Sequence, residues 1–197
     1  MGTDCHLLGT NVVGPWLFTD LLAPLLEKTA AQSPAGTVRV LWAGSFVVEA
    51  GSPTDGVQFE NDAPKVFNFP ARDYGQSKAA NVLLAREFMQ RHAGKNIISL
   101  AFNPGNLQTE LQRHTPALIT WVFNRIMLHP ARFGAYTELW AGWSEDVKGM
   151  ADGKVYAVPW GRNALPETRA DIVKALEEGV VGKKLWDWCA GETKAFR

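Results

Sequence analysis

Val38-Arg39-Val40-Leu41-Trp42-Ala43-Gly44-Ser45 is a run of β-branched and large apolar residues that ends on a hydroxyl. Such a run predicts a buried strand over residues 37–44. A second apolar run predicts a strand over residues 96–102, which the Pro104-Gly105 turn follows. Between them, the apolar pattern after Tyr74 predicts a helix over residues 72–93. Strand, helix and strand in this order are typical of a parallel βαβ unit.

The rest of the chain continues the alternation of helices and strands. A first helix is expected over residues 4–28, where Pro15 and Pro24 predict a bend or a restart. The other expected elements are a long loop at 46–70, a helical region at 107–128, a helix from Pro130 to Val147, a strand at 153–158 and a helix from Pro166 to Glu178. The pattern therefore predicts an α/β fold with a parallel sheet flanked by helices.

Tyr74 and Lys78 lie four residues apart at the start of the expected helix 72–93. Residues at this spacing share one helix face. An ammonium close to a phenol stabilises the phenolate, and a phenol in that setting can give or take a proton near neutral pH. The pair alone is also consistent with a surface lysine one turn beyond a half-buried tyrosine.

Further residues stand in a fixed order around this pair. Asn11 comes first, Ser45 ends a strand, and Pro104-Gly105 with Thr109 follows the next strand. This order resembles the short-chain dehydrogenase/reductase family, and the resemblance extends over nearly the whole chain. The segments 158–162 and 184–189 look most like members from filamentous fungi.

The resemblance implies a catalytic set of Asn11, Ser45, Tyr74 and Lys78. Tyr74 would exchange a proton with a carbonyl or alcohol oxygen, and Ser45 would hold that oxygen by a hydrogen bond. Lys78 would support the Tyr74 phenolate and bond the ribose of the cofactor. Asn11 would hold a water that links Lys78 to solvent. The reaction implied is hydride transfer between a nicotinamide cofactor and a carbonyl or secondary alcohol.

The resemblance also implies a nicotinamide cofactor, NADP or NAD. Its binding residues would be Asn11, Tyr74, Lys78, Pro104, Gly105 and Thr109. No Gly-rich turn of the kind that places a pyrophosphate at a helix N-terminus occurs in the 197 residues. We therefore expect one N-terminally truncated, partial Rossmann-like domain over residues 1–197, with cofactor binding weakened or lost.

The alternative interpretation is a non-catalytic remnant of that family, or a module that a partner completes. Without the first half of such a sheet, the strand at 37–44 would keep an unpaired edge. Helix faces that pack on the lost strands would also be exposed. A homo-oligomer is one way to cover such surfaces.

Composition excludes several other classes of protein. With 46% apolar and 20% charged residues the chain is globular, and its 20 basic and 20 acidic residues argue against a nucleic-acid surface. Two cysteines and four scattered histidines give no metal-ligand spacing. No signal sequence and no apolar run of spanning length is seen, so we expect a cytoplasmic protein without a transmembrane segment.

Residues 116–128 form the most apolar segment. It is interpreted as a substrate lid, a membrane-surface patch or core. An apolar lid would suit a hydrophobic small-molecule carbonyl compound or alcohol as substrate, and the sequence does not identify that substrate further.

Overall fold

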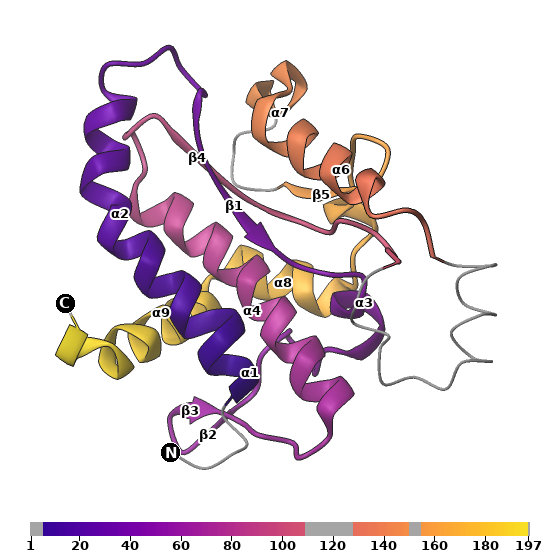
Figure 1. The fold of residues 1–197 in the computed structure, drawn as a ribbon. Helices are drawn as coiled ribbons and strands as arrows, with labels where there is room; N and C mark the ends of the chain where they lie inside the picture. Colours follow the sequence, from indigo (N-terminus) through magenta and orange to yellow (C-terminus); the bar gives the residue numbers. More distant parts are fainter. Residues whose placement is uncertain (1–5, 109–127, 150–154, 197) are drawn as a thin grey trace.

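The main sheet has four strands in the order β1-β4-β5-β6. The computed structural model describes residues 6–108, 128–149 and 155–196 (Figure 1). Within them, β1 (Val38–Ala43), β4 (Ile97–Phe102) and β5 (Tyr156–Val158) run parallel, and β6 (Arg162–Asn163) is antiparallel to β5. This arrangement confirms the predicted α/β fold, with a mostly parallel sheet as in part of a Rossmann-like domain.

Helices cover both faces of this sheet, and β4 shows why. Ile97 and Ala101 pack into a core with α2 (Gly14–Ala30), α4 (Pro70–Arg91), α8 (Ala170–Glu178) and α9 (Val180–Glu192). Ile98, Leu100 and Phe102 pack on the opposite side, against α6 (Arg132–Trp143) and α7 (Glu145–Gly149). All six residues of β4 are therefore buried, as expected for an inner strand of a parallel sheet.

The first helix continues through both of its prolines. It consists of α1 (His6–Leu8), a π-helical turn (Gly9–Val13) and α2. Pro15 stands in the first turn of α2, where its missing N–H is tolerated, and the wider π turn lies immediately before it. The restart expected at Pro24 does not occur, because α2 extends past it to Ala30.

The long loop expected at 46–70 contains regular structure. Val47–Gly51 forms α3, and β2 (Phe59–Glu60) pairs with β3 (Ala63–Pro64) as a short hairpin. Buried Gln76 of α4 fixes this hairpin, because its amide accepts the N–H of Gln58 at 3.0 Å and donates to the Lys65 carbonyl at 2.8 Å. A long-range contact of this kind has no local sequence signal.

Three differences occur in the C-terminal part. The helix expected at 130–147 divides into α6 and α7 at Ser144, whose hydroxyl accepts the N–H of Asp146 and caps the second helix. The helix expected from Pro166 begins instead with a 3₁₀ turn (Leu165–Glu167), and α8 follows. Helix α9 was not expected at all; Gly179, with φ 70°, ends α8 and lets α9 begin at once.

The other expected elements agree where the structure describes them. The strand at 153–158 is confirmed as β5 at its described end. The helical region at 107–128 lies almost wholly outside the described residues. Among the described helices, none combines the length and apolar character that crossing a bilayer requires.

Candidate active site

Tyr74 and Lys78 lie on one face at the start of α4. The Nζ atom of Lys78 is 5.7 Å from the centroid of the Tyr74 ring. The helix begins here because Pro70 stands in its first turn and Asp73 accepts the backbone N–H groups of Phe67 and Phe69, at 2.8 and 3.0 Å. The face sharing expected from their spacing is therefore present.

The end of β1 is held by side chains from the same helix. The Ala43 carbonyl accepts hydrogen bonds from Lys78 Nζ at 3.3 Å and from Asn81 Nδ2 at 2.9 Å. Burial lowers the pKa of Lys78 below that of an ordinary lysine. The ammonium group is thus fixed at the carboxyl end of a parallel strand, where open α/β sheets bind ligands.

Asn11 reaches the same region from the π-helical turn. Its Nδ2 donates to Ser77 Oγ at 3.1 Å, and Ser77 Oγ donates to the Tyr74 carbonyl at 2.8 Å. Asn11 also lines a groove together with Lys78. The buried Ser77 therefore links Asn11 to the Tyr74 backbone, while Asn11 and Lys78 share the groove.

Ser45 is positioned by Tyr156 of β5, two strands along the sheet from β1. The buried Tyr156 hydroxyl donates to the Ser45 carbonyl at 2.7 Å. Burial and the charge of Glu49 raise the pKa of Tyr156, so the hydroxyl remains a donor. A Cβ on Gly44 would lie 3.0 Å from the Tyr156 ring and 3.2 Å from its hydroxyl. The glycine before Ser45 therefore gives Tyr156 the room to reach that carbonyl.

The Ser45 hydroxyl accepts the N–H of Val47 at 3.4 Å, at the start of α3. Within the described residues, no hydrogen bond joins Ser45 to Tyr74. Ser45 is held by β5 through its carbonyl and by α3 through its hydroxyl, whereas Tyr74 belongs to α4.

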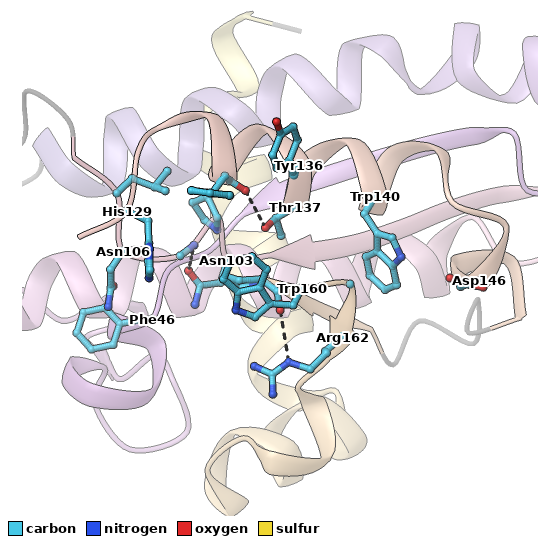
Figure 2. Close-up of a pocket in the computed structure, with 16 residues that line it drawn as sticks. Phe46, Asn103, Asn106, His129, Tyr136, Thr137, Trp140, Asp146, Trp160 and Arg162 are labelled. Atoms are coloured by element: carbon cyan, nitrogen blue, oxygen red, sulfur yellow. Dashed lines mark hydrogen bonds between the residues drawn. The ribbon is translucent and has the colours of Figure 1, made fainter. Parts of the chain in front are cut away.

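A cavity of about 650 Å³ lies beyond the carboxyl ends of β4 and β5 (Figure 2). We call it the aromatic cavity, because Phe46, His129, Phe133, Tyr136, Trp140 and Trp160 line it. In Figure 2, Phe46 and His129 lie at one end, Trp140 and Asp146 at the other, and Trp160 between them.

Pro104 and Gly105 also line the aromatic cavity. Gly105 has φ 90°, and a Cβ there would approach Pro159 to 2.8 Å, so this position requires glycine. Thr109, the third residue expected on the nicotinamide, lies outside the described residues. The cofactor residues implied by the resemblance are thus divided between two hollows, with Asn11 and Lys78 in the groove and Pro104 and Gly105 in the aromatic cavity.

Sequence reasoning missed Asn81 and Tyr156. Asn81 follows Lys78 by three residues, and this helical spacing could have placed it on the same face. Tyr156 lies 111 residues from Ser45 in the sequence, and no local sequence pattern predicts that contact.

The chain was compared with family models and with curated proteins. No family model matches the chain. It is 37% identical over 188 residues to the short-chain dehydrogenase/reductase iacJ of Pestalotiopsis fici, a match that covers 95% of this chain and 56% of that protein. It is 35% identical to bet4 of Neocamarosporium betae (99% and 57% covered) and 36% identical to pkfC of Emericella nidulans (96% and 59%), both also named short-chain dehydrogenase/reductase. The chain thus spans little more than half the length of these relatives.

Proposed function

We propose, because the chain belongs to the short-chain dehydrogenase/reductase family, that it transfers hydride between NAD or NADP and the carbonyl or secondary alcohol of a hydrophobic small molecule. The observation that carries the proposal is the placement of the Lys78 ammonium beside the Tyr74 ring and against the last carbonyl of β1.

In this proposal Tyr74 is the proton donor for a carbonyl oxygen and the acceptor in the reverse direction. Its hydroxyl has no hydrogen-bond partner within the described residues, so it is available to a substrate oxygen. Ser45, at the end of the neighbouring strand, would donate to the same oxygen and stabilise the charge that develops there. Asn11, which lines the groove with Lys78, would hold a water for the return of the proton.

The donor set fits the nicotinamide-ribose end of the cofactor. The Lys78 ammonium has three N–H groups and one acceptor within the described residues, the Ala43 carbonyl. Its remaining donors and the Tyr74 hydroxyl could bond ribose hydroxyls, and Pro104 and Gly105 would lie against the ring. When bound, the cofactor supplies the hydride. The 197 residues contain no Gly-rich turn for the pyrophosphate. The nicotinamide-ribose end would therefore contribute most of the free energy of cofactor binding.

Cofactor binding tests the proposal directly. Because Lys78 supplies the ribose contacts, we expect NADH or NADPH to quench tryptophan fluorescence with a dissociation constant below about 1 mM. Lys78→Met is expected to weaken that binding at least about tenfold. Lys184→Met removes an ammonium of α9 that pairs with Asp62, and it should leave binding unchanged. Absence of quenching up to millimolar cofactor in the parent protein would rule the proposal out for this chain.

The aromatic cavity supports a hydrophobic substrate. Trp160 has φ 69° in the β5–β6 turn, and its side chain is 68% exposed. A left-handed backbone at a bulky residue costs about 1–2 kcal/mol, and strain of this kind gathers at functional sites. The indole also meets the His129 ring edge-on, with 6.2 Å between ring centroids, and the Phe133 ring at a tilt of 59°, with 5.7 Å between centroids.

Trp160 should therefore contribute to substrate affinity. We expect Trp160→Ala to raise the dissociation constant of a bulky aromatic ketone about tenfold, measured by calorimetry, because a large apolar contact is lost. Trp143→Ala removes a tryptophan that is 74% exposed on α6 outside the cavity, and it should change the affinity less than about twofold. Equal effects of the two substitutions would contradict the assignment of the cavity.

A further inference from the structure

Asn103 is a buried polar residue in the mostly apolar wall of the aromatic cavity. It follows the last residue of β4 and is 9% exposed. Its backbone N–H donates to the Ala157 carbonyl at 2.7 Å, which fixes the residue to β5. In Figure 2 Asn103 lies in the middle of the cavity, with Phe46 to one side and Trp140 to the other. Its side chain therefore faces a space large enough for a ligand.

The orientation of the Asn103 amide follows from one hydrogen bond. Gly105 donates its backbone N–H to Asn103 Oδ1 at 2.9 Å. Because a backbone N–H can only donate, the atom that faces Gly105 must be the amide oxygen and not the nitrogen. The NH₂ group is therefore the other end of the amide, and it has no acceptor within the described residues. Its N–H donors are available to a molecule that occupies the cavity.

The other side-chain donors of the cavity differ from Asn103. Thr137 is also buried, but its hydroxyl donates to a backbone carbonyl of its own helix, α6, at 3.4 Å. Asn106 is only partly buried, and His129 and Arg162 are exposed, so water reaches them readily. In the part of the chain that the structure describes, Asn103 is thus the buried donor of this cavity that lacks an acceptor.

The free donor of Asn103 would meet the body of a substrate and not its reacting oxygen. In the proposed function Tyr74 and Ser45 hold the reacting oxygen. Neither of them lines the aromatic cavity, but Phe46, the residue after Ser45, does. A substrate whose reacting oxygen lies at Ser45 would therefore extend past Phe46 into the cavity, where its remaining atoms would approach Asn103.

We propose that Asn103 makes the aromatic cavity selective for oxygenated aromatic substrates. Such a substrate carries, besides its reacting carbonyl or alcohol, a second oxygen that accepts a hydrogen bond from Asn103 Nδ2. The aromatic side chains of the cavity would hold the ring system. An analogue without the second oxygen would displace water from the amide and leave its N–H groups unpaired, and a site rejects such an analogue strongly. The inference rests on the proposed function, since it takes this cavity as the substrate site.

The test compares two ligands of nearly equal size. An acetylnaphthalene that carries a methoxy group is compared with the one that carries an ethyl group at the same ring position, for each ring position in turn. Affinity is measured by calorimetry, with and without NADP. We expect the methoxy compound to bind at least about tenfold tighter than its ethyl counterpart at one or more ring positions. This comparison uses the unaltered protein, so it does not depend on the folding of a variant.

Asn103→Asp keeps the oxygen that Gly105 bonds and replaces the NH₂ group by an acceptor. At about pH 8, where a carboxyl group is charged, this variant should lose the preference for the methoxy compound. It should instead prefer a hydroxyl at the same ring position, because a hydroxyl can donate to the carboxylate. Asn106→Asp is the matched control, since it adds the same charge at a partly buried residue of the same cavity. There the ratio of the two affinities should stay within about twofold of the parent ratio.

Two outcomes would overturn the inference. The first is equal affinity for the methoxy and ethyl compounds at every ring position, absence of binding included. The second is a preference that Asn103→Asp and Asn106→Asp change equally. If Asn103→Asp does not fold, Asn103→Ser takes its place, because a serine hydroxyl can still accept the Gly105 N–H. Failure of the proposed function is distinct: a chain that prefers the methoxy compound but binds no NADH or NADPH would retain the selectivity of the cavity and lose the hydride-transfer assignment.

Discussion

Gly75→Ala is expected to destabilise the protein by about 2–3 kcal/mol, although alanine is the better helix former. Gly75 lies between Tyr74 and Gln76 in α4, where the helix crosses the end of α3. A Cβ added there would lie 2.6 and 2.7 Å from the carbonyl carbon and oxygen of Gly51 and 2.8 Å from the N of Ser52. These are backbone atoms, so the two helices must move apart. Because Tyr74 and Lys78 flank this contact, the movement would also displace the candidate site.

Gly191→Ala is the matched control for this prediction. Gly191 also lies in a helix, α9, but among the described residues no atom outside its own stretch of helix lies within 4 Å of an added Cβ. There the gain in helix propensity should stabilise the fold by up to about 1 kcal/mol. Urea denaturation of the two variants should therefore give shifts of opposite sign. Stabilisation by both substitutions would show that α3 and α4 do not approach each other as closely as the structure has them.

The sequence predicted the centre of the fold well because its signals are local. The strands at 37–44 and 96–102 and the helix at 72–93 were placed within two residues of β1, β4 and α4. Their apolar runs and stop residues need no tertiary contact to be interpreted. Helix α9 was missed, because its start depends on a left-handed Gly179 that also ends α8. The break between α6 and α7 depends on a single capping bond at Ser144.

The contacts of the candidate site are likewise of two kinds, those that local sequence spacing predicts and those that depend on tertiary packing. The shared face of Tyr74 and Lys78 follows from helical spacing alone. The bond from Asn11 to Ser77 joins residues 66 apart, and the bond from Tyr156 to Ser45 joins residues 111 apart. Such contacts depend on how helices and strands pack. The role of Gly75 was hidden for the same reason: its small size matters only because α3 passes beside it.

Tyr74→Phe is expected to lower the rate of hydride transfer at least about 10³-fold while leaving cofactor affinity and stability nearly unchanged. The substitution removes only the hydroxyl, which the proposal makes the proton donor, and general acid catalysis contributes about 10²–10⁴ in rate. The Tyr74 hydroxyl has no hydrogen bond within the described residues, so its loss leaves no buried partner unpaired. The measurement is single-turnover oxidation of NADPH with an aromatic ketone at saturating cofactor.

Tyr156→Phe provides the comparison, because it deletes a tyrosine hydroxyl that holds the Ser45 backbone beside the site. That hydroxyl is buried and bonds the Ser45 carbonyl at 2.7 Å, so its loss should destabilise the fold by about 1 kcal/mol. It should lower the rate less than Tyr74→Phe does, since Ser45 is displaced but the proton donor remains. Loss of a hydroxyl with a structural role should lower stability more than the rate, and loss of a catalytic hydroxyl should lower the rate more than stability. If Tyr74→Phe retained turnover within about tenfold of the parent, the proton would have to come from another group, because one lost acid should remove at least about 10² in rate.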